Sequence, residues 1–235
     1  MVYKGGVLIV GSLLWERSEI RSKWRRESLR ITNRVNIKAP IRYGRISESR
    51  YDTYTMVLSS KCNSKNDIGR AVFVPFLNDR LSIERIIEES KFMIDAERNK
   101  VKDFNRLNWG WGCVGIVINP KHFKNDELKN LLNTWSENYS RGFDPQQYKI
   151  GDEVPIINSG GVLNITWDNK IDDYDFFIAT VTKPNVKAYP TEEVIANLMI
   201  ENNYFDYFEN NINNAISTFQ DKNIELILKN NKNVK

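Results

Sequence analysis

The sequence predicts an α+β protein, in which strands fall mainly in the first half of the chain and helices lie between and after them. The clearest observation is a strict alternation over residues 34–43, where an apolar or aromatic side chain occupies every second position. A second is the recurrence of isoleucine at helical spacing over residues 82–98. A third is a pair of apolar helical patterns beyond residue 191. Strands and helices do not alternate regularly, so repeated β-α-β units are not expected.

The expected elements begin and end at residues suited to those positions. Ser18, Ser82 and Thr191 each precede an apolar helical pattern and are candidates for helix N-caps. Pro75 ends or edges a strand because proline has no amide N–H to donate. The expected strands cover residues 7–10, 35–43, 53–58, 71–76, 113–118 and 176–181. The expected helices follow Ser18, span 82–98 and 128–139, and close the chain over 191–199 and 205–216, with a hairpin turn at 158–161.

A single domain is expected over residues 1–228. The 235 residues, 41% of them hydrophobic, suffice for one sizeable core, and neither a repeat nor a Pro- or Gly-rich linker divides them. Residues 120–170 are interpreted as an elaboration on that domain. Residues 229–235 are polar and are interpreted as a frayed tail.

The scarcity of histidine and cysteine limits the kinds of catalytic and metal-binding site that the chain can form. The single histidine, His122, lies in a polar segment and is interpreted as a surface residue, so a site with several histidine ligands is excluded. Cys62 and Cys113 lack metal-site spacing; a disulfide between them stays open, although a buried inert thiol is favoured for Cys113. The sequence has neither a signal-peptide pattern nor a membrane-spanning run, so a cytoplasmic protein without a membrane partner is expected.

Basic residues gather between Arg21 and Arg34, with Trp24 among them, although the net charge is only +4. Such a run is able to meet phosphates, but a solvated face is the favoured interpretation. A nucleic-acid partner is therefore not expected. The Trp109-Gly-Trp-Gly112 element is interpreted as core or rim packing, with an aromatic wall beside the pocket as the alternative.

The opening strand ends abruptly in the stretch Val7-Leu-Ile-Val-Gly-Ser-Leu-Leu-Trp-Glu16. Gly11 and Ser12 separate two apolar segments, where a simple surface turn would carry polar residues after the pair. Two small residues at such a position allow either close packing of neighbouring segments or contact between a ligand and the main chain. The residues alone leave both explanations open.

One carboxylate falls on the apolar face of the helix expected at 82–98. At about 100° per residue, Glu97 shares a face with Ile83, Ile86, Ile87, Ser90 and Ile94, whereas Asp95 points to the side. Apolar surroundings raise the pKa of a carboxyl group toward the range useful for a general base. Glu97 is therefore a candidate base; fraying of the helix before it, or a structural ion pair, is the alternative explanation.

A candidate cation lies on the strand at 35–43 or just beyond it. If the alternation continues through Gly44 without a bulge, Arg45 and Ser47 face inward. A buried guanidinium requires an anionic partner, because an unpaired buried charge is costly. That partner is Glu97, another core carboxylate or a ligand, and the residues do not choose among them.

Together these segments resemble the gamma-glutamylcyclotransferase-like proteins, in particular a bacterial subgroup whose first strand ends in a Trp-Gly-Ser-Leu-Ile-Trp pattern. The resemblance covers roughly residues 7–100 and rests on Gly11-Ser-Leu-Leu-Trp15, Pro40, Arg45-Ile-Ser47, Arg50 and Thr53-Tyr-Thr-Met-Val-Leu58. It implies a small mixed β-barrel with surrounding helices and a helical C-terminus.

In active members of that family the Gly-Ser turn binds a substrate carboxylate through backbone N–H groups, and a glutamate acts as general base. By position, the resemblance implies substrate binding by Gly11, Ser12, Leu13 and Leu14 and catalysis by Glu97. Asp95 is the second choice for the base, because the spacing differs by one residue from that of better-known members. Neither a metal nor an organic cofactor is implied.

Two functions stay open on this basis. The first is cyclisation and cleavage of a small γ-glutamyl amine or amide to 5-oxoproline, with Arg45 or Ser47 orienting the substrate. The second is a non-catalytic module that binds a small anion, which is favoured by Val10 at the position where active members carry tyrosine. In both cases a small anionic or γ-glutamyl-type ligand is the expected partner.

Overall fold

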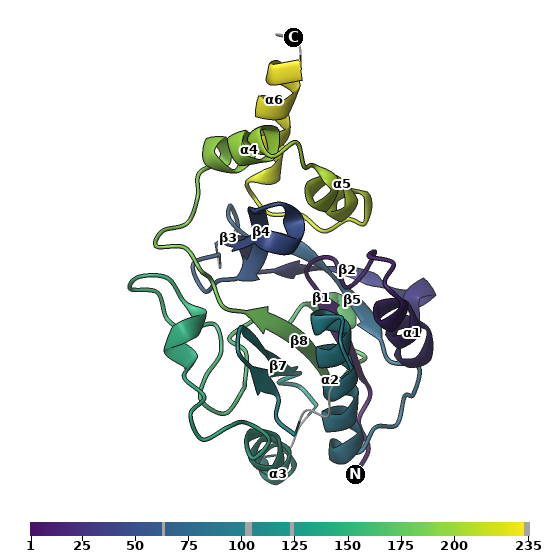
Figure 1. Ribbon diagram of the computed structural model, residues 1–235. Coiled ribbons are helices and arrows are strands. Elements are labelled where there is room, and N and C mark those ends of the chain that lie inside the picture. The colour runs from purple at the N-terminus through teal and green to yellow at the C-terminus, as the bar shows by residue number, and fades with distance from the viewer. Residues whose placement is uncertain (63, 102–104, 123–124, 233–235) are drawn as a thin grey trace.

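The computed structural model describes residues 1–62, 64–101, 105–122 and 125–232 and has an α+β fold (Figure 1). A six-stranded sheet curls into a half-barrel with strand order β2-β5-β1-β8-β7-β6. Its strands are β1 (Gly5–Ile9), β2 (Val35–Ala39), β5 (Gly69–Pro75), β6 (Asn108–Trp109), β7 (Gly112–Ile118) and β8 (Phe176–Thr182). A separate two-stranded sheet pairs β3 (Ile41–Ser47) with β4 (Thr53–Leu58).

Strand β1 is central to the half-barrel. All five of its residues are buried, which explains why it is apolar throughout rather than alternating. It pairs antiparallel with β5 and parallel with β8, where Leu8 lies opposite Ala179. Because parallel strands end at the same edge, the residues after β1 lie beside the carboxyl end of β8.

The alternating run at residues 35–43 is not one strand, as the sequence suggested, but two. Pro40 divides it: β2 pairs with β5 in the half-barrel, whereas β3 pairs with β4. Proline has no N–H for the ladder, and the carbonyl of Pro40 accepts the amide of Ser59 at 2.8 Å. The chain therefore changes sheets at this residue.

The assumption of an unbroken alternation through Gly44 is also wrong. The register of β3 against β4 shifts between Tyr43 and Arg45, so that these two residues face Met56 and Thr55 in succession. Gly44 is the extra residue of a bulge. A Cβ at Gly44 would lie 2.6 Å from Val57 and 3.0 Å from Tyr189, so the close approach of the neighbouring side chains favours glycine there.

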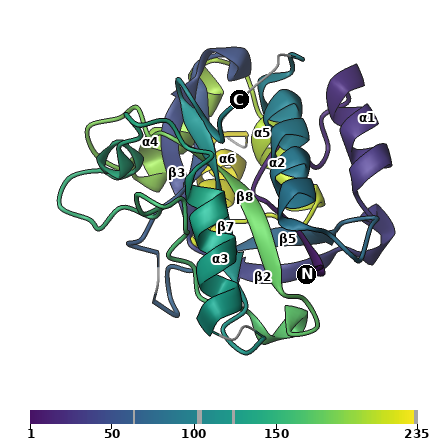
Figure 2. The same cartoon turned by 90° about the horizontal axis from the view of Figure 1, so that it is seen from below.

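The described residues contain six α-helices: α1 (Glu19–Ser28), α2 (Ile83–Arg98), α3 (Asn125–Ser136), α4 (Glu192–Glu201), α5 (Asp206–Asn213) and α6 (Asp221–Lys232). Ser18, Ser82 and Thr191 each accept a hydrogen bond at the first turn of a helix, which confirms the three expected N-caps. Helix α2 packs on β7 and β8 and against α1 (Figure 2).

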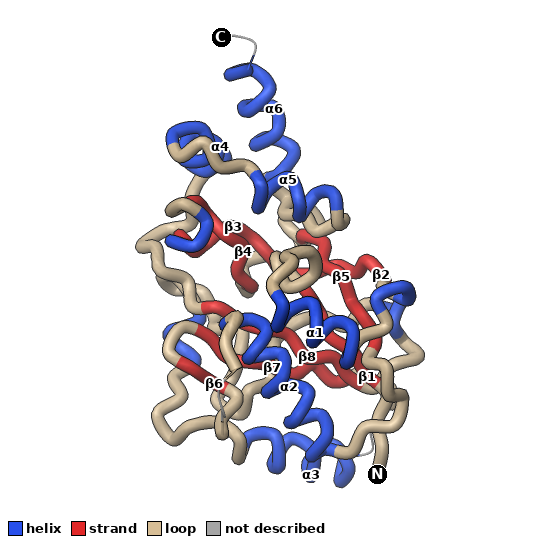
Figure 3. The backbone as a smooth tube through the Cα atoms, turned by 45° about the vertical axis from the view of Figure 1, so that its right-hand side comes forward, coloured by secondary structure: helices blue, strands red, loops and turns tan. Residues whose placement is uncertain are grey.

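Helices α4, α5 and α6 gather at one end of the molecule, beyond β3 and β4 (Figures 1 and 3). The sequence predicted two closing helices, the second over 205–216. The structure ends that helix at Asn213 and adds α6, which was missed because its residues are mostly polar. The tail expected at 229–235 is helical as far as Lys232, and its last three residues lie outside the described part of the chain.

Cys62 and Cys113 are both free and buried, so the alternative of a disulfide between them is wrong. Burial raises the pKa of the Cys62 thiol to about 11 and that of Cys113 to about 12. Among the described residues, no helix combines the length and the apolar character needed to cross a membrane.

Candidate functional site

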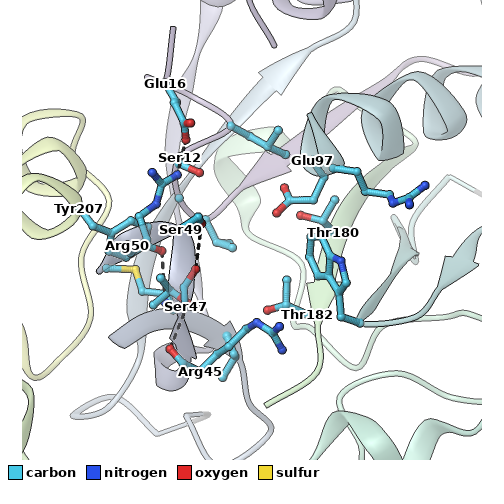
Figure 4. A pocket seen from close by; sticks show the side chains of 18 of the residues that line it. Ser12, Glu16, Arg45, Ser47, Ser49, Arg50, Glu97, Thr180, Thr182 and Tyr207 are labelled. Carbon is cyan, nitrogen blue, oxygen red and sulfur yellow. Dashed lines mark hydrogen bonds and ion pairs between the residues drawn. The ribbon is translucent and has the colours of Figure 1, made fainter. Parts of the chain in front are cut away.

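A cavity of about 620 Å³ lies where β1 and β8 end. Its wall comes from the loop after β1, the end of α2, the end of β8, the two-stranded sheet with its connecting turn Glu48–Arg50, and one residue of α5. Figure 4 shows side chains from these segments pointing toward the same space. The parallel pairing of β1 with β8 brings the first and third of these segments together although they are far apart in the sequence.

The structure brings most of the predicted site residues to this cavity, namely Gly11, Ser12, Leu13, Arg45, Ser47 and Glu97. Leu14 is the exception, because it is not part of the cavity wall and its side chain packs in the hydrophobic core. Asp95, the second choice for the base, is not part of the cavity wall. The helical periodicity therefore predicted which of the two carboxylates lines the cavity, and the role of Glu97 as a base stays a prediction.

The loop after β1 coils into a helical turn. The amides of Leu14 and Glu16 donate to the carbonyls of Gly11 and Ser12 at 3.1 and 2.9 Å. The first amides of such a turn have no acceptor within it. In the described part of the chain, no residue accepts the amides of Ser12 and Leu13, and both residues line the cavity. These two N–H groups are suited to an anionic oxygen.

Two arginines of α1 hold this loop in place. Arg25 donates from Nη1 to the carbonyl of Leu13 at 2.6 Å and from Nη2 to that of Glu16 at 2.7 Å. Arg21 is 6% exposed and donates to the Ser12 hydroxyl at 3.3 Å. The interpretation of the basic run as a solvated face is therefore wrong for these two residues. Trp24 is 5% exposed, so its ring does not present a stacking surface for a base.

Glu16 is the carboxylate that is neutralised by arginine. It forms ion pairs with both Arg21 and Arg50, and the two guanidinium groups are largely buried. Burial opposes the charge of Glu16, but the Arg50 hydrogen bond and the charges of Arg21 and Arg50 hold its pKa below the usual range. Glu16 therefore stays ionised and serves to order the arginines.

Glu97 lies in the last turn of α2 and differs from Glu16 in its surroundings. Burial raises its pKa; the charges of Arg21 and Arg50 and a hydrogen bond with Thr180 oppose this rise, and the charge of Glu16 adds to it. No ion pair within 4.0 Å involves Glu97 among the described residues. Figure 4 shows its carboxyl group directed into the cavity beside Thr180. This carboxyl group has the raised pKa and the access to the cavity that a general base requires.

Arg45 lies on the cavity and has no carboxylate partner within 4.0 Å in the described chain. Its Nη1 donates to the carbonyl of Lys183 at 2.7 Å, and its guanidinium lies 5.6 Å from the ring centre of Trp111. Burial lowers the pKa of Arg45, while the charge of Glu97 acts in the opposite direction. Glu97 was one of the partners considered for Arg45 from the sequence. Its charge affects the pKa of Arg45, but the two side chains do not form an ion pair.

Several cavity residues were not identified from sequence: Glu16, Arg21, Arg50, Trp111, Thr180 and Tyr207. Arg50 is one of the residues that carried the family resemblance, and Glu16 ends the opening stretch Val7–Glu16, so the charges of both were an available signal. Trp111 belongs to the aromatic element for which core or rim packing was favoured over a pocket wall; Trp109 is buried, whereas Trp111 lies on the cavity. Tyr207 lies on α5, and its hydroxyl contacts Met56, which is 151 positions away in the sequence. A local sequence pattern does not reveal a contact of this kind.

His122 lies outside the cavity and contacts Asp175 at 2.8 Å, in agreement with a surface position. Across the residues that the structure describes, no group of three or more His, Cys, Asp or Glu side chains is arranged to hold a metal ion. No protein-family model, curated protein or solved structure matches the chain. The site's own chemistry is therefore the basis for assigning a function.

Proposed function

We propose that this protein is a gamma-glutamylcyclotransferase-like enzyme that cyclises and cleaves a small γ-glutamyl amine or amide, releasing 5-oxoproline. The observation that carries the proposal is the state of Glu97, a cavity carboxyl group with a raised pKa and no ion pair to any residue that the structure describes. Under this proposal, the curled six-stranded sheet belongs to the mixed β-barrel fold of that family.

The substrate's carboxylate binds to the amides of Ser12 and Leu13, which lack an acceptor in the described protein. Gly11 precedes them and keeps that part of the loop free of a side chain. Arg45 supplies a positive charge on the same cavity and orients the remainder of the substrate, with Ser47 at the rim. These groups recognise an anion that also carries polar atoms.

Glu97 accepts a proton from the α-amino group of the γ-glutamyl unit, which makes the nitrogen nucleophilic. The nitrogen then attacks the γ-carbonyl carbon, and a C–N bond closes a five-membered ring. The ring nitrogen passes its second proton to the leaving nitrogen, the bond from the γ-carbon to that nitrogen breaks, and Glu97 returns the first proton, so that the amine departs as an ammonium ion. The products are 5-oxoproline and a free amine, and the atoms balance without water or a cofactor. A well-placed general base contributes about 10²–10⁴-fold to such a rate.

A second candidate is a non-catalytic module that binds a small anion in the same cavity. Val10 favours it, because no tyrosine precedes Gly11 as in active members of the family. The charge of Arg45, without a carboxylate partner in the described chain, also suits an anion-binding role. In this case the carboxyl group of Glu97 hydrogen-bonds to the ligand without transferring a proton.

Release of 5-oxoproline from a panel of γ-glutamyl dipeptides and γ-glutamyl amines separates the two candidates. The proposal predicts turnover of at least one substrate class by the purified chain. Saturable binding of the same compounds without any product would favour the binding module. Absence of both binding and product across the panel would remove both candidates.

A further inference from the structure

Tyr207 reaches the cavity from α5 and has no part in the chemistry described above. It is 5% exposed, and it belongs to the cavity wall. A Cβ added to Gly11 would lie 2.8 Å from its hydroxyl oxygen. The phenol therefore stands directly against the residue that begins the anion-binding loop.

The hydroxyl oxygen of Tyr207 accepts a hydrogen bond, whereas its proton is free to be donated to a ligand. The amide of Met56 donates to this oxygen at 3.2 Å. Burial raises the pKa of Tyr207 to about 12, against the hydrogen bonds with Met56 and Asn211, so the phenol keeps its proton at neutral pH. In the described part of the chain, no hydrogen bond in which Tyr207 donates that proton is found. A buried donor without an acceptor is costly, and a ligand oxygen would relieve that cost.

The position of Tyr207 against the loop is held by neighbouring contacts. Trp15 donates from its indole nitrogen to the side-chain oxygen of Asn211, one turn along α5, at 2.8 Å. The rings of Trp15 and Tyr207 meet edge to face with centroids 6.2 Å apart. Arg50 lies 6.0 Å from the centre of the Tyr207 ring. The loop and α5 are thus tied together on both sides of the phenol.

We propose that Tyr207 is a ligand-binding residue that donates its hydroxyl proton to the same oxygen-bearing group held by the amides of Ser12 and Leu13. The proposal rests on the proposed function for the identity of that group, a carboxylate of a γ-glutamyl compound. A hydroxyl and two amides then converge on one carboxylate from two elements far apart in sequence. The C-terminal helices complete the site, which the first hundred residues do not form alone.

Calorimetric titration of 5-oxoproline into the intact chain measures its binding affinity and tests this role. Tyr207→Phe removes only the hydroxyl and is expected to weaken binding roughly 10-fold or more, since a hydrogen bond to a charged group is lost. Tyr174→Phe is the matched control, because Tyr174 is half-buried, packs 4.7 Å from Phe73 and lies outside the cavity wall. Its affinity is expected to equal that of the wild type. Equal affinity of Tyr207→Phe and wild type, or no binding by wild type, would overturn the proposal.

A double substitution tests the contact with Gly11. Gly11→Ala alone is expected to weaken binding, because the new methyl group displaces the hydroxyl. Combined with Tyr207→Phe it is expected to add little, since the next nearest ring atoms are 3.6 Å away. Fully additive losses would contradict the shared contact. Wild-type chain that binds 5-oxoproline but never produces it would refute the proposed reaction alone and leave the role of Tyr207 intact.

Discussion

Arg21 donates from Nη2 to the main-chain carbonyl of Glu97 at 3.0 Å, while its charge is neutralised by Glu16 rather than by the Glu97 side chain. A second bond from Nε to the carbonyl of Ala96 measures 2.9 Å. The end of α2 is thereby fixed against the loop after β1. The base candidate is positioned by an arginine that does not form an ion pair with its carboxyl group.

Arg21→Met is expected to destabilise the protein by about 3 kcal/mol, because it removes one partner of a buried ion pair and three further hydrogen bonds. Urea unfolding measures this change in the free energy of unfolding. The control is Arg26→Met on the same helix, whose side chain is 70% exposed and which should change stability by less than about 0.5 kcal/mol. Equal effects of the two substitutions would show that Arg21 does not anchor α2.

Glu97→Gln is expected to stabilise the protein at pH 7.5. The pKa of Glu97 is raised in the folded state, so the ionised form costs stability above that pKa. The cost disappears as the pH falls below the unfolded-state pKa of about 4.3. The gain should therefore shrink between pH 7.5 and pH 4 in urea unfolding. A gain that grows toward low pH would mean that the pKa is lowered instead.

Arg45→Met is expected to raise KM roughly 10-fold to 100-fold with little change in kcat, because it removes a charged contact made equally in ground and transition states. Steady-state kinetics on the best γ-glutamyl substrate provide the measurement. Arg70→Met, an exposed arginine on β5 outside the cavity, serves as the control. An unchanged KM in Arg45→Met would place the substrate away from this guanidinium.

Neither cysteine is expected to react with a thiol-specific reagent in the native protein. Cys62 and Cys113 are both buried, and burial raises their pKa values to about 11 and about 12, so little thiolate forms at pH 8. Both should react once denaturant is added. Rapid labelling of either thiol without denaturant would show that its surroundings open readily.

Local sequence patterns predicted the parts of the site that lie within single elements. The 3.6-residue period of α2 placed Glu97 on the apolar face and Asp95 to its side, because a regular helix determines the direction of every side chain along it. The apolar segments around Gly11 and Ser12 likewise identified the cavity loop. The α+β class followed from where strand and helix patterns occur along the chain.

The remaining parts depend on contacts that no local pattern contains. Alternation persisted across Pro40 because both β2 and β3 bury one face, so the change of sheet was invisible. Arg45 reached the cavity although the bulge at Gly44 invalidated the alternation used to place it. Arg21 and Arg25 resembled surface charges until their acceptors were known, which are carbonyls at the end of α2 for Arg21 and carbonyls of the loop after β1 for Arg25.

Glu97 is the general base in the proposed release of 5-oxoproline. Product formation from the best γ-glutamyl substrate is therefore measured for wild type, Glu97→Gln and Glu84→Gln, an exposed position on the same helix. Loss of at least about 100-fold in kcat for Glu97→Gln alone, with an acid limb in the wild-type pH profile above that of an ordinary glutamate, is the predicted result. Wild-type turnover that persists unchanged in Glu97→Gln would contradict it.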